Sequence, residues 1–201
     1  MSFIEVIPYK KADKTLKRVY DKVKGKNGEI DNILKVHSLR PHTLTGHMSL
    51  YKNVLHNNNN TLPKWYLECI GVYISVLNKC DYCVNHHFEG MRRLVNDETK
   101  AFSIKKALES DLKSDFLTQK EVLGLKYSRI VTTNPSAVNL NLIKQLHNDG
   151  FTDGEILEIN QVTAYFNYAN RTVLGLGVNI EGDVLGLSPN DSNDENNWSH
   201  Q

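Results

Sequence analysis

The segment from Trp65 to Leu77 constrains the fold of this 201-residue chain more than any other part of the sequence. It is apolar on most faces of a helix, and a helix that is apolar all round is buried. A short break is expected at residues 78–79, and a new helix should run from about Cys80 to Val95. The sequence therefore predicts a buried helix that turns directly into a helix beginning with a cysteine.

Helical signals recur through the rest of the chain. Thr118 to Glu121 and Thr152 to Glu155 both fit the capping-box pattern that opens a helix. Gly150 marks the end of a shorter helix between them. The other expected helices span about 13–24, a stretch from Pro41, 118–132, 138–148 and 152–176. Because these segments cover most of the chain, we predict an all-α fold.

The composition argues against several classes of protein. A net charge of +1 gives no field to attract nucleic acid or an anionic membrane. No apolar run reaches the roughly 18 residues of a membrane span, and the first residues lack the layout of a signal peptide. Three cysteines imply no disulfide framework and fit a reducing compartment. We therefore expect a cytoplasmic protein with no nucleic-acid or membrane partner.

Paired cysteines and a histidine form the candidate reactive segment. Cys80, Cys83 and His87 share one helix face, because side chains three and four residues apart are neighbours. A thiol beside an imidazole can be deprotonated, and a second thiol one turn away can close a disulfide on it. Proximity to His87 favours Cys83 as the nucleophile, whereas the helix dipole favours Cys80. The spacing alone leaves that choice open.

Glu68 lies within the apolar segment, where a carboxylate is unfavourable unless it is paired or protonated. It could face a surface edge or pair with a structural lysine or arginine. Glu68 lies one helix before the paired cysteines, and this position favours a functional role. If the two helices pack antiparallel, Glu68 approaches His87 directly or through a water molecule.

The neighbouring residues have plainer interpretations. His86 faces about 100° away from His87 on a helix, so it is expected to be exposed or to pack. Cys69 is interpreted as a small buried hydrophobic residue. Asp81 and Tyr82 are expected to be solvated or to cap the helix.

Three kinds of site compete for the reactive segment. A zinc site built from Cys80, Cys83 and a histidine lacks a fourth ligand in the local pattern. A thioredoxin-like module needs a strand before the motif, but the preceding residues have a helical pattern. An all-helical thiol peroxidase or disulfide reductase fits every residue named. The chain shows no flavin or nicotinamide motif, and we expect neither a cofactor nor a metal.

The spacing from Glu68 to Cys80-Asp81-Tyr82-Cys83 and on to His87 resembles the active-site signature of the alkylhydroperoxidase AhpD-like proteins of the carboxymuconolactone decarboxylase superfamily. Residues 36–41 (Val-His-Ser-Leu-Arg-Pro) and 164–171 (Ala-Tyr-Phe-Asn-Tyr-Ala-Asn-Arg) are similar to segments of its peroxidase-related branch. The resemblance covers about residues 5 to 180. The decarboxylase branch works without the cysteine pair, so the pair argues against lactone decarboxylation.

The resemblance implies an AhpD-like fold of two related helical-hairpin units and a homo-oligomer. We expect a single domain over residues 1–187, with the redox motif in 62–95 and a degenerate second unit at about 118–178. Residues 67–70 align with residues 157–160 in a faint internal repeat, which reflects either a duplicated helical unit or chance similarity between two amphipathic helices. The polar tail at 188–201 is expected to be disordered or to pack on a partner chain.

The resemblance also implies site roles for a peroxidase that reduces hydrogen or alkyl hydroperoxides. Cys83 would be the peroxidatic thiolate and Cys80 the resolving thiol, with His87 as base or proton relay and Glu68 completing the relay. An external dithiol protein would reduce the disulfide. Some members have a histidine where this chain has Tyr82, which leaves a second relay histidine and the nature of the oxidant open. The alternatives are a disulfide oxidoreductase and a non-enzymatic redox sensor.

Overall fold

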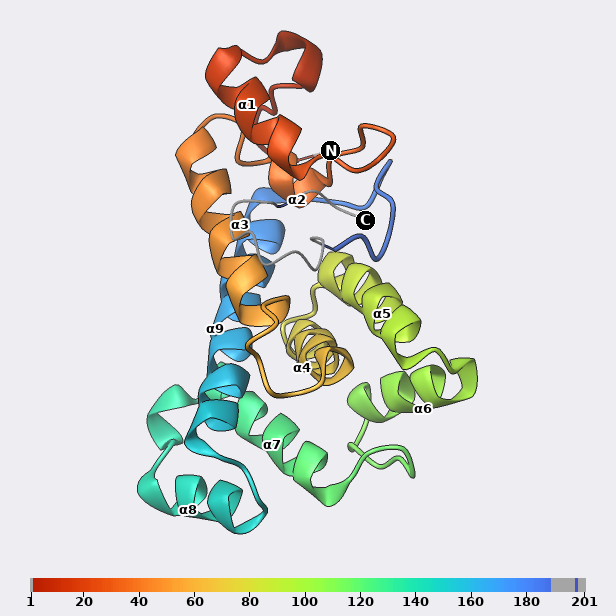
Figure 1. Cartoon of the computed structure of the whole chain (residues 1–201), viewed down its shortest axis with the longest axis vertical. Helices are drawn as coiled ribbons and strands as arrows, with labels where there is room; N and C mark the ends of the chain where they lie inside the picture. Colours follow the sequence, from red (N-terminus) through yellow and green to blue (C-terminus); the bar gives the residue numbers. More distant parts are fainter. Residues whose placement is uncertain (1, 189–197, 199–201) are drawn as a thin grey trace.

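The computed structural model describes residues 2–188 and Trp198, and this part of the chain is helical with no strand (Figure 1). The predicted all-α fold is confirmed. The helices are α1 (Lys14–Val23), α2 (Asn32–Lys35), α3 (Pro41–Leu55), α4 (Lys64–Leu77), α5 (Asp81–Val95), α6 (Glu98–Leu108), α7 (Gln119–Thr133), α8 (Leu140–Asn148) and α9 (Asp153–Leu176), with short 3-10 turns at Tyr9–Lys11 and Pro135–Ala137.

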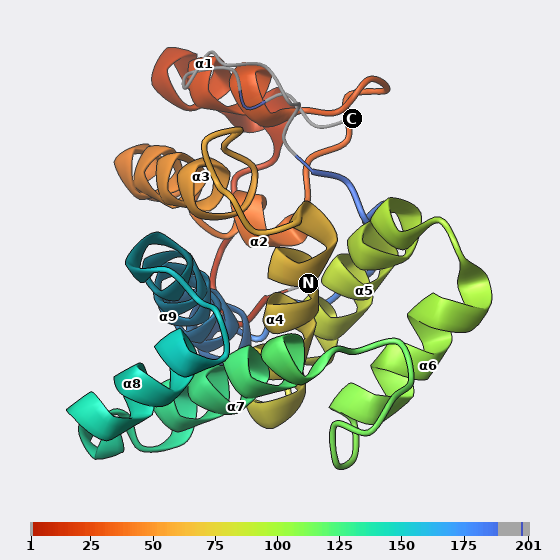
Figure 2. The same ribbon diagram turned by 60° about the horizontal axis from the view of Figure 1, so that its bottom comes forward.

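Helix α4 lies at the centre of the molecule, as the apolar segment predicts. It packs against α5, α9, α7, α6 and α3, and every residue from Tyr66 to Ser75 is buried. The ends of the molecule are formed by α1 on one side and by α7 with α8 on the other (Figures 1 and 2). One apolar helix is thus buried by five others at the centre of the core.

The helix ends show why local signals predicted the fold well. Thr118 and Thr152 each form a complete capping box with Glu121 and Glu155. The helix expected at 138–148 begins at Leu140, because the Asn139 side chain caps it by accepting two backbone N–H groups. Helices α2 and α6 were not expected from the sequence.

The turn between α4 and α5 positions the reactive segment. Lys79 adopts a left-handed conformation with φ of 57°, which non-glycine residues seldom do. The Cys80 N–H then donates to the Ser75 carbonyl at 2.8 Å. Cys80 becomes the N-cap of α5, and α4 and α5 form a tightly packed helical hairpin. The predicted break at 78–79 is confirmed.

Helices α4 and α9 approach each other closely at Gly71. A β-carbon at this position would lie 2.2 Å from the ring of Phe166 in α9, well inside van der Waals contact. The same ring meets His87 edge-on, with centroids 4.5 Å apart. The absence of a side chain at Gly71 therefore leaves room for the aromatic ring that packs against His87.

After α9 the chain turns back through residues 179–188 and passes α2 and α5 (Figures 1 and 2). The tail expected at 188–201 lies outside the described residues except for Ser188 and Trp198. Trp198 is buried in the main core, with Lys22 over its ring.

Candidate active site

The two cysteines of the motif lie with their sulfur atoms 3.1 Å apart. That separation exceeds the roughly 2.05 Å of a disulfide bond, so both thiols are reduced and in hydrogen-bonding contact. Cys80 is fully buried, and Cys83 is 2% exposed. Closing a disulfide requires a movement of about 1 Å, because the sulfurs are already adjacent.

The proton shared by this pair has a preferred position. The hydrogen bond between the two sulfurs is the main influence that lowers the pKa of the Cys80 thiol; burial raises that pKa, and a hydrogen bond with the Cys83 backbone lowers it further. The same contact with Cys80, together with burial, holds the pKa of Cys83 well above its ordinary value. The pair therefore loses its first proton with the charge on Cys80, at the helix N-terminus.

Polar groups from α4 and α9 surround the Cys83 sulfur. Hydrogen bonds from Asn170 and Ser75 oppose the rise in its pKa, although they do not overcome it. Asn170 also donates to the Ser75 hydroxyl at 3.0 Å, and both residues are fully buried. These groups provide hydrogen bonds that would stabilise negative charge on Cys83.

The predicted contact between Glu68 and His87 is present. Glu68 Oε2 lies 2.7 Å from His87 Nδ1, and Glu68 is 3% exposed. The other carboxylate oxygen, Oε1, lies 3.6 Å from Nε2 of His56, a buried residue at the end of α3. Glu68 thus sits between two imidazoles, one of which the sequence did not indicate.

Cys83, Glu68 and His87 line one pocket of about 40 Å³. Tyr51, Tyr165 and other side chains complete its wall. Burial raises the pKa of both tyrosines well above the ordinary value, so their hydroxyl groups stay protonated. Cys80 is not part of the wall and lies behind Cys83. The structure therefore brings together all four predicted site residues and exposes only Cys83 of the two thiols to the pocket.

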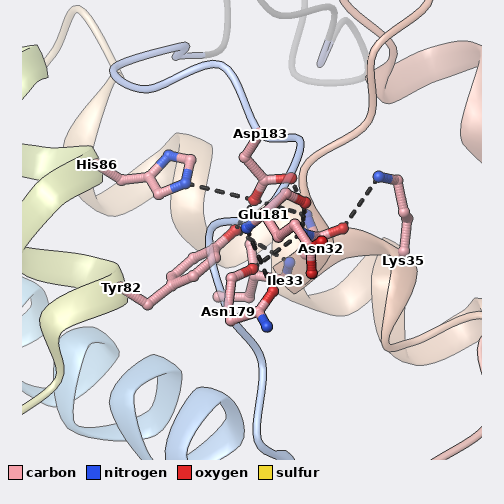
Figure 3. A network of polar contacts seen from close by, with 8 residues as sticks. All are labelled: Asn32, Ile33, Lys35, Tyr82, His86, Asn179, Glu181 and Asp183. Atoms are coloured by element: carbon pink, nitrogen blue, oxygen red, sulfur yellow. Dashed lines mark hydrogen bonds and ion pairs between the residues drawn. The ribbon is translucent and has the colours of Figure 1, made fainter. Parts of the chain in front are cut away.

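Tyr82 is buried, so the expectation that it is solvated or caps the helix is wrong. Its hydroxyl donates to Asp183 Oδ2 at 2.7 Å and accepts from the Ile33 N–H at 3.1 Å. Asp183 also accepts from the Asn32 N–H at 3.0 Å, and His86 Nε2 lies 3.4 Å from the same carboxylate (Figure 3). Tyr82 therefore faces away from the sulfurs and joins α5 to the residues that follow α9.

The remaining neighbours follow the sequence interpretation. His86 packs on the Tyr82 ring, with centroids 4.5 Å apart. Cys69 is fully buried in the main core, and burial raises the pKa of its thiol. Asp81 is exposed on the first turn of α5.

Residues 2–188 and Trp198 contain neither a cluster of metal-ligating side chains nor a membrane-spanning helix. No group of three or more histidine, cysteine, aspartate or glutamate side chains in this part of the chain is arranged to hold a metal ion. Within the same residues, no helix is long and apolar enough to cross a membrane.

The arrangement of helices is the AhpD-like helical fold. No family model and no curated protein matches the sequence. Solved structures do match. An uncharacterized peroxidase-related protein with an AhpD core from Ralstonia eutropha JMP134 is 23% identical, over 89% of this chain and 91% of that chain, with a TM-score of 0.77. The predicted AhpD-like fold is confirmed.

Two further structures show the breadth of this fold. An uncharacterized peroxidase-related protein from Silicibacter sp. TM1040 is 23% identical, over 89% of this chain and 91% of that chain, with a TM-score of 0.75. The debrominase Bmp8 is 18% identical, over 84% of this chain and 87% of that chain, with a TM-score of 0.68. Bmp8 has also been solved as a cysteine-to-alanine variant with 2,3,4-tribromopyrrole. The fold therefore supports more than one activity.

Proposed function

We propose that this chain is a thiol-dependent peroxidase that reduces small hydroperoxides through a dithiol–disulfide cycle of Cys80 and Cys83. One observation carries the proposal. Cys83 lines a small pocket beside the paired Glu68 and His87, and a second thiol lies 3.1 Å behind it. A nucleophile, a proton relay and a resolving thiol thus occupy one buried site.

In the first step, Cys83 attacks the hydroperoxide. The hydrogen bond between the sulfurs lets the Cys83 proton pass to Cys80, which moves the negative charge to the sulfur that faces the pocket. A sulfur–oxygen bond forms as the oxygen–oxygen bond breaks, so Cys83 becomes a sulfenic acid. The departing oxygen takes a proton relayed by His87 and leaves as water or an alcohol.

In the second step, Cys80 attacks the sulfur of the sulfenic acid. A disulfide forms, the sulfur–oxygen bond breaks, and the oxygen leaves as water. An external dithiol then reduces the disulfide and is itself oxidised to a disulfide, which returns Cys80 and Cys83 to thiols. We propose that a dithiol protein supplies these two electrons.

The size of the pocket favours a small hydroperoxide as the substrate. The pocket's volume of about 40 Å³ is more than the roughly 10–15 Å³ that one water molecule needs, so a molecule the size of hydrogen peroxide can enter. Hydrogen peroxide and small alkyl hydroperoxides are the substrates that fit best.

The test is hydrogen peroxide consumption by the purified protein with dithiothreitol as reductant. We expect turnover in the unaltered chain and in Cys69→Ala, because Cys69 lies in the core away from the pocket. Cys83→Ser should abolish it. Cys80→Ser should let a sulfenic acid accumulate on Cys83, detected as a dimedone adduct by mass spectrometry.

Two results would contradict the proposal. Full peroxide turnover by Cys83→Ser would remove Cys83 from the reaction. A chain that forms the disulfide once and never turns over with any dithiol would be a redox sensor instead.

A further inference from the structure

Residues 179–188, here called the C-terminal strap, run from the end of α9 across α2 and then along α5, from Tyr82 near its start to Arg93 near its end. Two carbonyls near the start of the strap, those of Asn179 and Glu181, accept hydrogen bonds from the Asn32 side chain, each at 2.9 Å. The far end of the strap, including Gly186 and Ser188, lines the pocket that holds Cys83. The strap therefore connects an anchor on α2 to the wall of the active-site pocket.

Asp183 is the central anchor of the strap (Figure 3). Its side chain is fully buried and meets three groups: the Tyr82 hydroxyl, the Asn32 N–H and His86 Nε2. Burial opposes ionisation, but hydrogen bonds from His86, Asn32 and Tyr82 outweigh it and hold the pKa of Asp183 below its ordinary value. An ionised carboxylate makes the stronger, charge-assisted form of these bonds.

A second anchor lies beyond Asp183. The Arg93 guanidinium donates to the carbonyls of Gly186 and Leu185 at 3.1 and 3.0 Å. Gly186 has a φ of 75°, and a β-carbon there would lie 2.6 Å from Glu89 Cγ. The strap thus touches α5 closely at the point where it closes the pocket.

We infer that Asp183 holds the C-terminal strap over the pocket, and that the closed strap limits the size of the molecules that reach Cys83. The selection of small peroxides rests on the proposed function, whereas the control of access to the Cys83 thiol does not depend on it. Tyr82 and Asp183 are 101 residues apart in the sequence, and the Tyr82 hydroxyl donates its hydrogen bond to the strap and not to the sulfurs. Cys83 is 2% exposed with the strap in place, so a bulky reagent reaches it only when the strap moves.

Tyr82 gives the strap a direct connection to the reactive motif. It stands between Cys80 and Cys83 in the sequence, on the first turn of α5. Displacement of the strap therefore opens the pocket next to the cysteine pair while Glu68 and His87, which contact each other on the α4–α5 hairpin, keep their positions. Small substrates pass the closed strap, and large ones depend on its opening.

The experiment compares a small and a bulky probe of the same chemistry. The peroxide pair is hydrogen peroxide and cumene hydroperoxide, read as kcat/KM with dithiothreitol. The thiol pair is N-ethylmaleimide and fluorescein maleimide, read as the rate of Cys83 modification by mass spectrometry of the reduced chain. For each pair we compare the rate with the bulky probe to the rate with the small probe. In Asp183→Asn and Tyr82→Phe we expect this ratio to rise by about tenfold for both pairs, because loss of a charge-assisted hydrogen bond raises the population of molecules with an open strap.

Glu181→Gln is the matched control, since it removes an exposed carboxylate from the same strap and should leave both ratios unchanged. Tyr82→Phe removes a single hydroxyl, so it retains the test if Asp183→Asn fails to fold. Unchanged ratios in folded Asp183→Asn and Tyr82→Phe would overturn the inference. If the unaltered chain consumes no peroxide, the proposed function fails, and the thiol-modification ratio alone decides whether the strap controls access.

Discussion

Glu68 on α4 and His87 on α5 are joined by a 2.7 Å contact between Oε2 and Nδ1 inside the α4–α5 hairpin. When a carboxylate accepts a hydrogen bond from Nδ1, the neutral imidazole carries its lone pair on Nε2 and can act there as a base. The second Glu68 oxygen faces His56, so the carboxylate is held from two sides. The geometry of the relay therefore depends on the packing of two helices and not on one motif.

Glu68→Gln tests that relationship. The amide keeps the size of the side chain but removes the charge that orients His87, so we expect kcat for hydrogen peroxide to fall by about 100-fold. The measurement is steady-state peroxide consumption alongside a circular dichroism spectrum. Glu5→Gln, at an exposed glutamate, should keep full activity. Unaltered kcat in Glu68→Gln would mean that His87 needs no carboxylate partner.

The cysteine pair allows a direct test of how its proton is shared. Contact with Cys80 is the main influence that raises the pKa of Cys83, so Cys80→Ala should lower it. Conversely, Cys83→Ala removes the hydrogen bond that lowers the pKa of Cys80, and that pKa should rise. Ultraviolet absorbance of the thiolate against pH measures both. We expect the pKa of Cys83 to fall in Cys80→Ala and the pKa of Cys80 to rise in Cys83→Ala. If both pKa values moved in the same direction, the two thiols would not share a proton.

The fold was predictable because its signals are local. Capping boxes at Thr118 and Thr152 and an apolar run in α4 act within one helix each. Helix α6 was not predicted because its apolar stripe is short. Its N-cap, Asp97, accepts a hydrogen bond from the Lys100 N–H, and this capping residue is a signal that the sequence does contain.

The site was predictable only where the chain itself forces a contact. A two-residue break between α4 and α5 makes a hairpin that brings Glu68 to His87. His56 and Asp183 reach the site through tertiary packing from distant segments, and no spacing rule connects them to the motif. The expectation for Tyr82 was wrong for the same reason, since the strap that buries it lies about a hundred residues away.

Asp31 is expected to make stability depend on pH. It lines the pocket, and burial raises its pKa to about 7 against the opposing charge of His86. An unfolded aspartate titrates near pH 4, so between about pH 4 and pH 7 the folded chain holds a proton that the unfolded chain has released. The free energy of unfolding therefore falls as the pH rises through this window, by about 4 kcal/mol at most.

Urea denaturation at the two ends of that window checks the prediction. Asp31→Asn cannot ionise, so its free energy of unfolding should decline less with pH than that of the unaltered chain. Asp81→Asn, at an exposed position, should follow the unaltered chain. Parallel pH profiles for the unaltered chain and Asp31→Asn would show that Asp31 is already ionised in the folded state.

Gly71 and Gly46 form a matched pair for testing the contact between α4 and α9. Both lie inside helices, but a β-carbon at Gly71 would meet the Phe166 ring at 2.2 Å, whereas one at Gly46 would meet nothing within 4 Å. We expect Gly71→Ala to lower the free energy of unfolding by about 1–3 kcal/mol through overpacking. Gly46→Ala should raise it by up to about 1 kcal/mol through helix propensity.

The same pair connects packing to chemistry, because Phe166 also contacts the His87 ring. A ring displaced by Gly71→Ala would shift His87 relative to Cys83, so peroxide turnover should fall even under conditions where the variant is folded. Urea denaturation gives the stability, and peroxide consumption at low temperature gives the turnover. Gly46→Ala should retain full turnover. If Gly71→Ala is as stable and as active as Gly46→Ala, Phe166 moves freely and does not fix the position of His87.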